Sequence, residues 1–343
     1  MKLALALCVA ACGPSATSNT DPGSLPTGDP QSSSIWDRVD ARELGARLAE
    51  LTGEAQVSVD GATYSITNRW SPLAKQRFRA YWTAYMTSLG ADVSEVTFPV
   101  SSALAGETTG HDLEAVLPGR SPDSVVIVVH YDTVGVAGSE RANPGADDDG
   151  SGLAMQLEAA RIFAQITDRA NTVRFVAADY EEISDDLAGD QAYVAYLQKQ
   201  AALQRFQILV ASDNDQTGWS CWSDGLCTDD TPDPDTTFEL ISCSGDSNHW
   251  DFPSLADGLA AVADRHGSAL QPTPLCDGSG DTDHYAFWQA GIPAYVIEEW
   301  SADQNPHFDN LGDDTMAHID FGLLAETARI QITFQAQLAG ITP

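Results

Sequence analysis

Hydrophobic residues in this chain fall into short uninterrupted runs and into segments of helical spacing, which alternate along the sequence. The run SVVIVV at 124–129 has the length and the β-branched content of a strand buried on both faces. Similar apolar runs predict strands near 93–100, 111–117, 124–129, 172–178, 206–211 and 294–297. Helical spacing of apolar residues predicts helices at 35–51, 72–89, 150–166, 190–204, 250–266, 283–290 and 320–338. This alternation predicts an α/β fold of three layers, in which a mixed, largely parallel sheet is sandwiched by helices. A single domain is expected over 35–343, with a cysteine-containing insertion near 217–247.

Residues that can bind metals follow three of the predicted strands directly. The pairs are His130/Asp132, Glu181/Glu182 and Asp213/Asp215. Because the carboxyl ends of parallel strands meet at one edge of a sheet, these side chains are expected to lie close together. The loop GADDDGSG at 145–152 and the segment NPHFDN at 305–310 add further candidates. Imidazole and carboxylate ligands without a thiolate are typical of zinc, or another first-row divalent cation, in an open catalytic site.

Five motifs follow one another in a recognisable order: HYDT, GADDDGSG, the EE pair, the aspartate after FQILVAS, and TDHYAFWQAGIPA. Together they resemble the co-catalytic di-zinc aminopeptidase family, which includes the secreted bacterial leucyl aminopeptidases and aminopeptidase Y. The resemblance extends from about Pro72 to the C-terminus. It implies the three-layer fold and a metallopeptidase that uses two zinc ions, or other divalent first-row metals, to remove N-terminal residues from peptides.

The resemblance also implies roles for individual residues. The metal ligands that match the family's positions are His130, Asp148, Glu182 and Asp213, and His307 is the favoured candidate for the last ligand. Asp148 would bridge the two metals, and Asp132 would orient the imidazole of His130. Glu181 would be the general base that deprotonates the attacking water. At the third strand end Asp215 is the alternative to Asp213, because the register there is open.

The last ligand departs from the family's pattern. The family usually has a histidine four residues before an Asp-Thr pair, and counting back from Asp314 leads to Asn310. His307 is the only histidine nearby, and Asp309 is the alternative, since a carboxylate can replace an imidazole. We favour His307.

Two other functions fit part of this pattern. Glutaminyl cyclases, which use a single zinc, share the HYD motif and the fold, and the number of bound metals would distinguish them from a di-zinc hydrolase. A catalytically inactive relative that acts as a surface binding protein is the second alternative, because Asn310 stands where the family has a histidine.

The N-terminus resembles a bacterial export signal. Met1 and Lys2 precede the short apolar stretch Leu3–Ala11, which is too short to span a bilayer. VAACG resembles a lipobox, so Cys12 is expected to become the lipidated first residue, followed by a flexible tether to residue 34. A plain secretory signal is the alternative. The expected location is the outer membrane or cell surface, facing the periplasm or the exterior, with membrane contact only through the lipid.

The charge of the chain limits its partners. Lys and Arg number 17 against 50 Asp and Glu, which gives a formal net charge of -33. Such a surface repels nucleic acid and anionic lipid, so neither is an expected partner. Peptide substrates are the partners that the resemblance implies, and a monomer is the expected state. Acidic loops, Thr228–Glu239 above all, are candidates for binding calcium.

Four cysteines remain outside the signal: Cys221, Cys227, Cys243 and Cys276. An even number in an oxidising compartment predicts two disulfides, for which three connectivities exist. Closeness in sequence favours Cys221–Cys227 with Cys243–Cys276. A structural zinc site made of the four thiolates is the alternative, although their irregular spacing argues against it.

Overall fold

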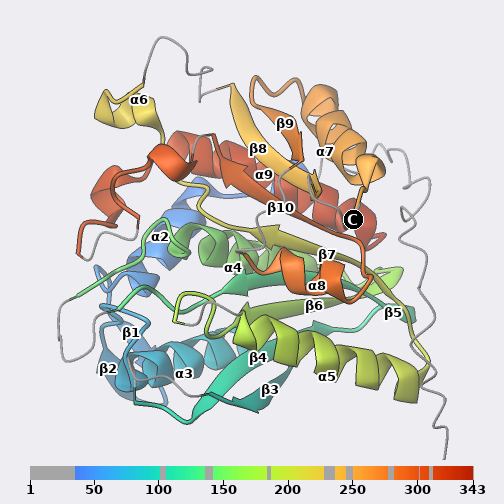
Figure 1. Ribbon diagram of the computed structural model, residues 1–343, viewed down its shortest axis with the longest axis horizontal. Helices are drawn as coiled ribbons and strands as arrows, with labels where there is room; N and C mark the ends of the chain where they lie inside the picture. The colour runs from blue at the N-terminus through green and yellow to red at the C-terminus, as the bar shows by residue number, and fades with distance from the viewer. Residues whose placement is uncertain are drawn as a thin grey trace, which may run out of the picture.

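The computed structural model describes residues 35–100, 106–135, 142–183, 187–227, 236–244, 250–276, 282–300, 302–308 and 312–342. Its centre is an eight-stranded sheet of order β3-β4-β6-β5-β7-β10-β8-β9 (Figure 1). The strands are β3 (Asp92–Pro99), β4 (Thr109–Leu117), β5 (Ser121–His130), β6 (Asn171–Ala178), β7 (Ile208–Asn214), β8 (Thr237–Cys243), β9 (Gln271–Cys276) and β10 (Ala294–Glu299). Four of the seven neighbouring pairs are parallel, which confirms the expected mixed, largely parallel sheet.

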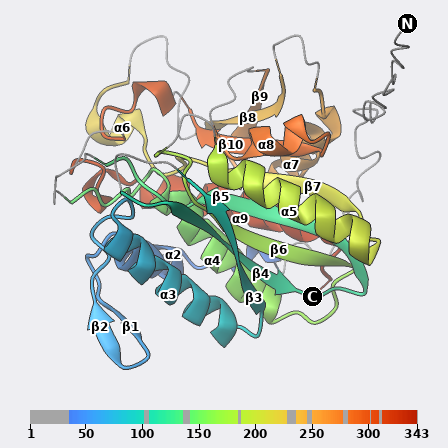
Figure 2. The same cartoon turned by 60° about the horizontal axis from the view of Figure 1, so that its bottom comes forward.

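Helices cover both faces of this sheet (Figure 2). They are α2 (Ala41–Leu51), α3 (Pro72–Ser88), α4 (Gly150–Ala164), α5 (Ala188–Gln204), α6 (Cys221–Asp224), α7 (Pro253–His266), α8 (His284–Gln289) and α9 (Phe321–Leu338). On one face α4 packs against α2 and α9, while α5 and α8 lie together on the other. Two short 3-10 helices, η1 (Ala302–Gln304) and η2 (Met316–His318), follow β10.

Four short strands were not predicted from the hydrophobic pattern. β1 (Val57–Val59) and β2 (Ala62–Tyr64) form a separate hairpin, and β8 and β9 extend one end of the main sheet. β8 lies within the Gly-, Pro- and Asp-rich segment 217–247. β9 has the sequence QPTPLC, and its two prolines explain its place at the edge, because proline cannot donate a ladder hydrogen bond.

The helix α4 forms the middle of the core. Nearly all its residues are buried, because the sheet lies on one side of it and other helices on the other. Gln156 is the polar residue at its centre: its amide donates to the carbonyls of Ile127 and Val176 on β5 and β6, and its oxygen accepts from Trp82 on α3. These bonds satisfy the buried amide and fix α4 against the two strands that lead to the metal-binding motifs.

Both expected disulfides are confirmed. Cys221 pairs with Cys227 around the short helix α6, and Cys243 at the end of β8 pairs with Cys276 at the end of β9. The second bond joins two neighbouring strands of the outer part of the sheet. In the described residues, every helix is too short or too polar to cross a membrane.

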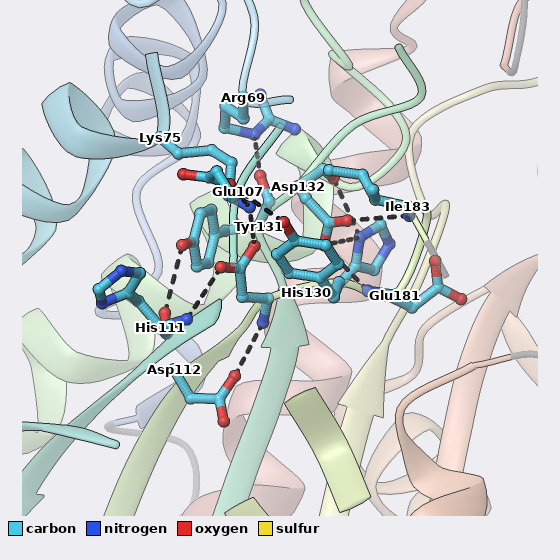
Figure 3. Close-up of polar contacts among 12 residues, drawn as sticks. Arg69, Lys75, Glu107, His111, Asp112, His130, Tyr131, Asp132, Glu181 and Ile183 are labelled. Atoms are coloured by element: carbon cyan, nitrogen blue, oxygen red, sulfur yellow. Dashed lines mark hydrogen bonds and ion pairs between the residues drawn. The ribbon is translucent and has the colours of Figure 1, made fainter. Parts of the chain in front are cut away.

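A buried lysine joins α3 to the end of β6. The ammonium group of Lys75 lies 2.7 Å from Asp179 and 2.8 Å from Glu107, and it stands 3.9 Å from the centre of the Tyr180 ring. The side chains of Lys75 and Asp179 are both fully buried. Figure 3 shows Lys75 and Glu107 close to Tyr131, the residue that follows β5. Removing only one partner of a buried ion pair strongly destabilises the folded protein, because the other charge stays buried without compensation.

We predict that Lys75→Met lowers the free energy of unfolding by about 3 kcal/mol, because it leaves a buried carboxylate without its cation. Lys199→Met, at an exposed position of α5, is the matched control and should change it by less than about 0.5 kcal/mol. Urea unfolding followed by circular dichroism measures both. Equal stability of the two variants would contradict a structural role for Lys75.

The effect of this variant should also depend on pH. Burial raises the pKa of Asp179 to about 6, although the charge of Lys75 opposes this. A carboxyl whose pKa is raised by folding binds its proton more tightly in the folded state, so its contribution to stability falls as pH rises. Removal of Lys75 should raise the pKa further, so the stability difference between wild type and Lys75→Met should widen from about pH 5 to about pH 8. A difference that narrows over this range would contradict the assignment.

Candidate metal centre

His130 lies at the carboxyl end of β5 with its two ring nitrogens in different surroundings. Its Nδ1 is 3.2 Å from the backbone oxygen of Asp132, while its Nε2 is 3.2 Å from Asp148 Oδ1 and 3.6 Å from Asp215 Oδ1. A carbonyl oxygen only accepts, so Nδ1 holds the proton and donates it. In the neutral ring Nε2 would then carry the lone pair, on the side that faces the two carboxylates, where a metal could bind.

The carboxylate of Asp132 holds the turn that contains the two glutamates. Oδ1 accepts the backbone N–H of Glu181 at 3.1 Å, and Oδ2 accepts that of Ile183 at 3.2 Å (Figure 3). The same carboxylate is 4.0 Å from Nδ1 of His130. The imidazole is therefore oriented by the backbone of Asp132, and the side chain positions the residues that follow β6.

The three consecutive aspartates of the GADDDGSG loop have different partners. Asp147 accepts hydrogen bonds from the N–H of Gly218 and from the amide of Asn305. Asp148 faces His130. Asp149 accepts the N–H of Gly152 at the start of α4, and its other oxygen has no hydrogen-bond partner in the described part of the chain.

The loop itself is held by Asp314, whose two oxygens accept the N–H groups of Asp147 and Asp148 at 2.8 and 3.0 Å. Arg69 holds it from the other side. This fully buried guanidinium donates to the backbone oxygens of Tyr131, just beyond β5, and of Gly145 in the loop. Arg69 was not predicted from the sequence, because a lone arginine outside any motif does not indicate that its side chain is buried.

The structure brings Asp215, and not Asp213, to His130. In the parallel pairing of β5 with β7, Asp213 is level with Val128, so the residue two positions further on is level with His130. Asp213 Oδ2 instead accepts hydrogen bonds from Thr282 Oγ1 at 2.9 Å and from the N–H of His284 at 3.0 Å. The geometry therefore favours the alternative register that the sequence left open.

Glu181 and Glu182 lie half-buried in the turn after β6. His307 is engaged elsewhere: its Nδ1 is 3.0 Å from Asp313, and its ring stacks on that of His318. Among the described residues, His307 groups with these two and not with His130. The alternative ligand, Asp309, and Asn310 lie outside the described residues.

Burial makes the charges of this centre repel one another strongly. Burial alone would lower the pKa of His130, but the neighbouring carboxylates, Glu181 foremost, outweigh it and raise this pKa well above its usual value. Burial raises the pKa of Glu181 well above its usual value, and the charge of His130 opposes this only in part. Buried carboxylates at such density call for a compensating cation.

The donor atoms fit a divalent first-row metal. One nitrogen of His130 and one oxygen each of Asp149 and Asp215 lie within 4.8 Å of one another. The oxygens of Asp149 and Asp215 that have no hydrogen-bond partner in the described residues are buried, so an ion would satisfy atoms that the protein leaves unpaired. An imidazole with carboxylates and no thiolate is a donor set that zinc accepts.

Comparison with known proteins gives a consistent result. The sequence profile of peptidase family M28 matches residues 112–335. Leucine aminopeptidase 1 of Chaetomium globosum is 27% identical over 233 residues, covering 66% of this chain and 52% of that protein, so the chain spans about half of this relative. A probable leucine aminopeptidase of Arthroderma benhamiae is 25% identical over 288 residues, which cover 78% of this chain and 72% of the relative.

Solved structures share the fold. A zinc aminopeptidase from Bacillus subtilis superposes with a TM-score of 0.65 at 16% identity, covering 87% of this chain and 95% of that one. The glutaminyl cyclase of Macrostomum lignano superposes with a TM-score of 0.69 at 18% identity, covering 95% and 98%. At these identities the likeness shows the fold alone.

The two candidate aspartates after β7 can be separated by mutation. We predict that Asp215→Asn weakens zinc binding at least about a hundredfold, which is the upper end for residues that only support a ligand. The matched change two residues earlier, Asp213→Asn, should weaken zinc binding less than about tenfold. Competition with a chromophoric chelator measures both affinities. The opposite ranking would restore Asp213 as the ligand.

Proposed function

This chain belongs to peptidase family M28, and we propose that it is an exported metallo-aminopeptidase that hydrolyses N-terminal residues from peptides. The observation that supports this best is the convergence of His130, Asp148 and Asp215 beside the Glu181–Glu182 turn. Buried carboxylates and an imidazole at the carboxyl ends of parallel strands are a donor set for metal-assisted hydrolysis.

In this proposal two divalent cations, zinc in the first place, would bind between the strand ends. His130 and Asp215 would hold one of them, Glu182 the other, and Asp148 both. The segment 305–310 would supply the last ligand. The sequence favoured His307 for this position, but its contacts with Asp313 and His318 favour Asp309.

When bound, the two cations would polarise the scissile carbonyl and lower the pKa of the attacking water. Glu181 would accept the proton of that water and deliver it to the nitrogen of the leaving amine. A carboxylate with a raised pKa is suited to this task, because it holds the proton long enough to transfer it. Asp132 would keep this base in place through the backbone N–H of Glu181.

Export is part of the proposal. Two disulfides are typical of proteins that work in an oxidising compartment. Residues 1–34, with the lipobox-like VAACG and Cys12, lie outside the described residues. We propose that the chain is anchored through a lipid on Cys12 at the outer membrane or cell surface and acts there as a monomer.

A glutaminyl cyclase is the runner-up, because the fold is equally close to that of a cyclase. The two activities differ in product and in metal content. A cyclase would convert an N-terminal glutamine to pyroglutamate with one zinc per chain, whereas the aminopeptidase would release the residue with two. Mass spectrometry of a glutamine-initiated peptide after incubation separates these products.

We predict that Glu181→Gln lowers kcat for aminoacyl-nitroanilides at least about a hundredfold while the bound metal is retained, because only the proton acceptor is removed. Glu54→Gln, a matched change at an exposed position, should leave kcat unchanged. A chelator should abolish the wild-type activity, and added zinc should restore it. Full activity of Glu181→Gln would exclude Glu181 as the base, and chelator-insensitive turnover would exclude the metallopeptidase.

A further inference from the structure

We propose that His307, Asp313 and His318 form a separate zinc site beside the metal centre, which binds one ion in addition to the catalytic pair. The three side chains come from the segment between β10 and α9. None of them groups with His130 among the described residues. The site therefore goes beyond the proposed peptidase activity and does not require it.

The geometry of the three side chains suits a metal. The imidazoles of His307 and His318 stack with centroids 3.5 Å apart and planes 14° from parallel. Nδ1 of His307 is 3.0 Å and Nε2 of His318 is 3.8 Å from oxygens of the same Asp313 carboxylate. Donor atoms in a tetrahedral zinc site are about 3.3 Å apart, which is close to these separations. Because the rings are stacked, one imidazole would have to turn about its Cβ–Cγ bond so that both nitrogen lone pairs point at one ion.

The backbone around these residues is already fixed. The N–H of His307 donates to Asn305, whose amide is bonded to Asp147 and Glu299. The N–H of His318 donates to Thr315, and the next residue, Ile319, pairs with Trp219. The ligands are thus presented by a frame that does not have to order when an ion binds, which favours affinity.

The chemistry and exposure of the group favour zinc. Two imidazoles and one carboxylate are three of the four ligands that zinc takes, and water can supply the fourth. The side chains are 13%, 48% and 26% exposed for His307, Asp313 and His318, so an ion can enter from solvent. The formal net charge of -33 further favours cation binding at the surface.

A bound ion would connect this surface to the catalytic loop. Asp313 is followed by Asp314, which accepts the N–H groups of Asp147 and Asp148. His307 follows Asn305, which is bonded to Asp147. An ion that binds His307 and Asp313 would hold together two residues that lie near these loop contacts, so its role would be structural.

The experiment counts zinc. The full chain is stripped with a chelator, reloaded with zinc chloride, desalted and analysed by mass spectrometry for metal per chain. His318→Gln and Asp313→Asn should each bind one equivalent less than wild type, while His266→Gln, a histidine stacked on Trp36 elsewhere, should bind as much as wild type. Zinc should also raise the Tm of Asp215→Asn, and this shift should be smaller in Asp215→Asn combined with His318→Gln.

The outcomes separate this site from the proposed catalytic pair. Loss of one equivalent when His318→Gln is added to Asp215→Asn supports the site, even if the wild type shows no peptidase activity. Equal zinc content in wild type, His318→Gln and Asp313→Asn would overturn it. So would complete loss of zinc in Asp215→Asn, because the three residues would then bind no ion of their own.

Discussion

The metal centre depends on the two hydrogen bonds by which Asp132 connects β5 to the turn after β6. Its carboxylate accepts the N–H groups of Glu181 and Ile183, and its backbone oxygen faces Nδ1 of His130. Hydrogen bonds to an ionised acceptor are roughly twice as strong as neutral ones. They act on a turn in which Tyr180 has φ 67°, a conformation that costs a bulky residue about 1 kcal/mol. One residue thus fixes both the imidazole and the glutamates, and the strand ends cannot separate without breaking these bonds.

Carboxylates in this protein serve two physical purposes, and only their surroundings distinguish them. Asp132 and Asp314 accept backbone N–H groups and shape loops, while Asp148 and Asp215 point at Nε2 of His130. Burial raises the pKa of Asp314 to about 7, although its N–H donors oppose this. Burial and the nearby charge of Asp148 thus make this carboxyl harder to ionise, and a cation in the centre would relieve that penalty.

Much of this could be predicted from the sequence. The buried run before His130 predicted the central strand, and five motifs in order predicted the family, which is confirmed. The choice between Asp213 and Asp215 could not be predicted, because it depends on how β7 is registered against β5, and a strand pattern has no information about its neighbour's register. Arg69 could not be predicted either, because its role depends on hydrogen bonds to backbone oxygens that are distant in sequence.

In the stretch from Asn305 to Asp320 the family's motif spacing does not identify the last ligand. Counting assumes a fixed number of residues between a ligand and the following Asp-Thr pair. Here Asp314 accepts two backbone N–H groups of the GADDDGSG loop, and the amide of Asn305 donates to Asp147 of the same loop. Among the described residues, His307 contacts Asp313, and the ring of His318 stacks on the ring of His307. The partners of His307 are therefore Asp313 and His318, and these three side chains are the donor set of the proposed additional zinc site.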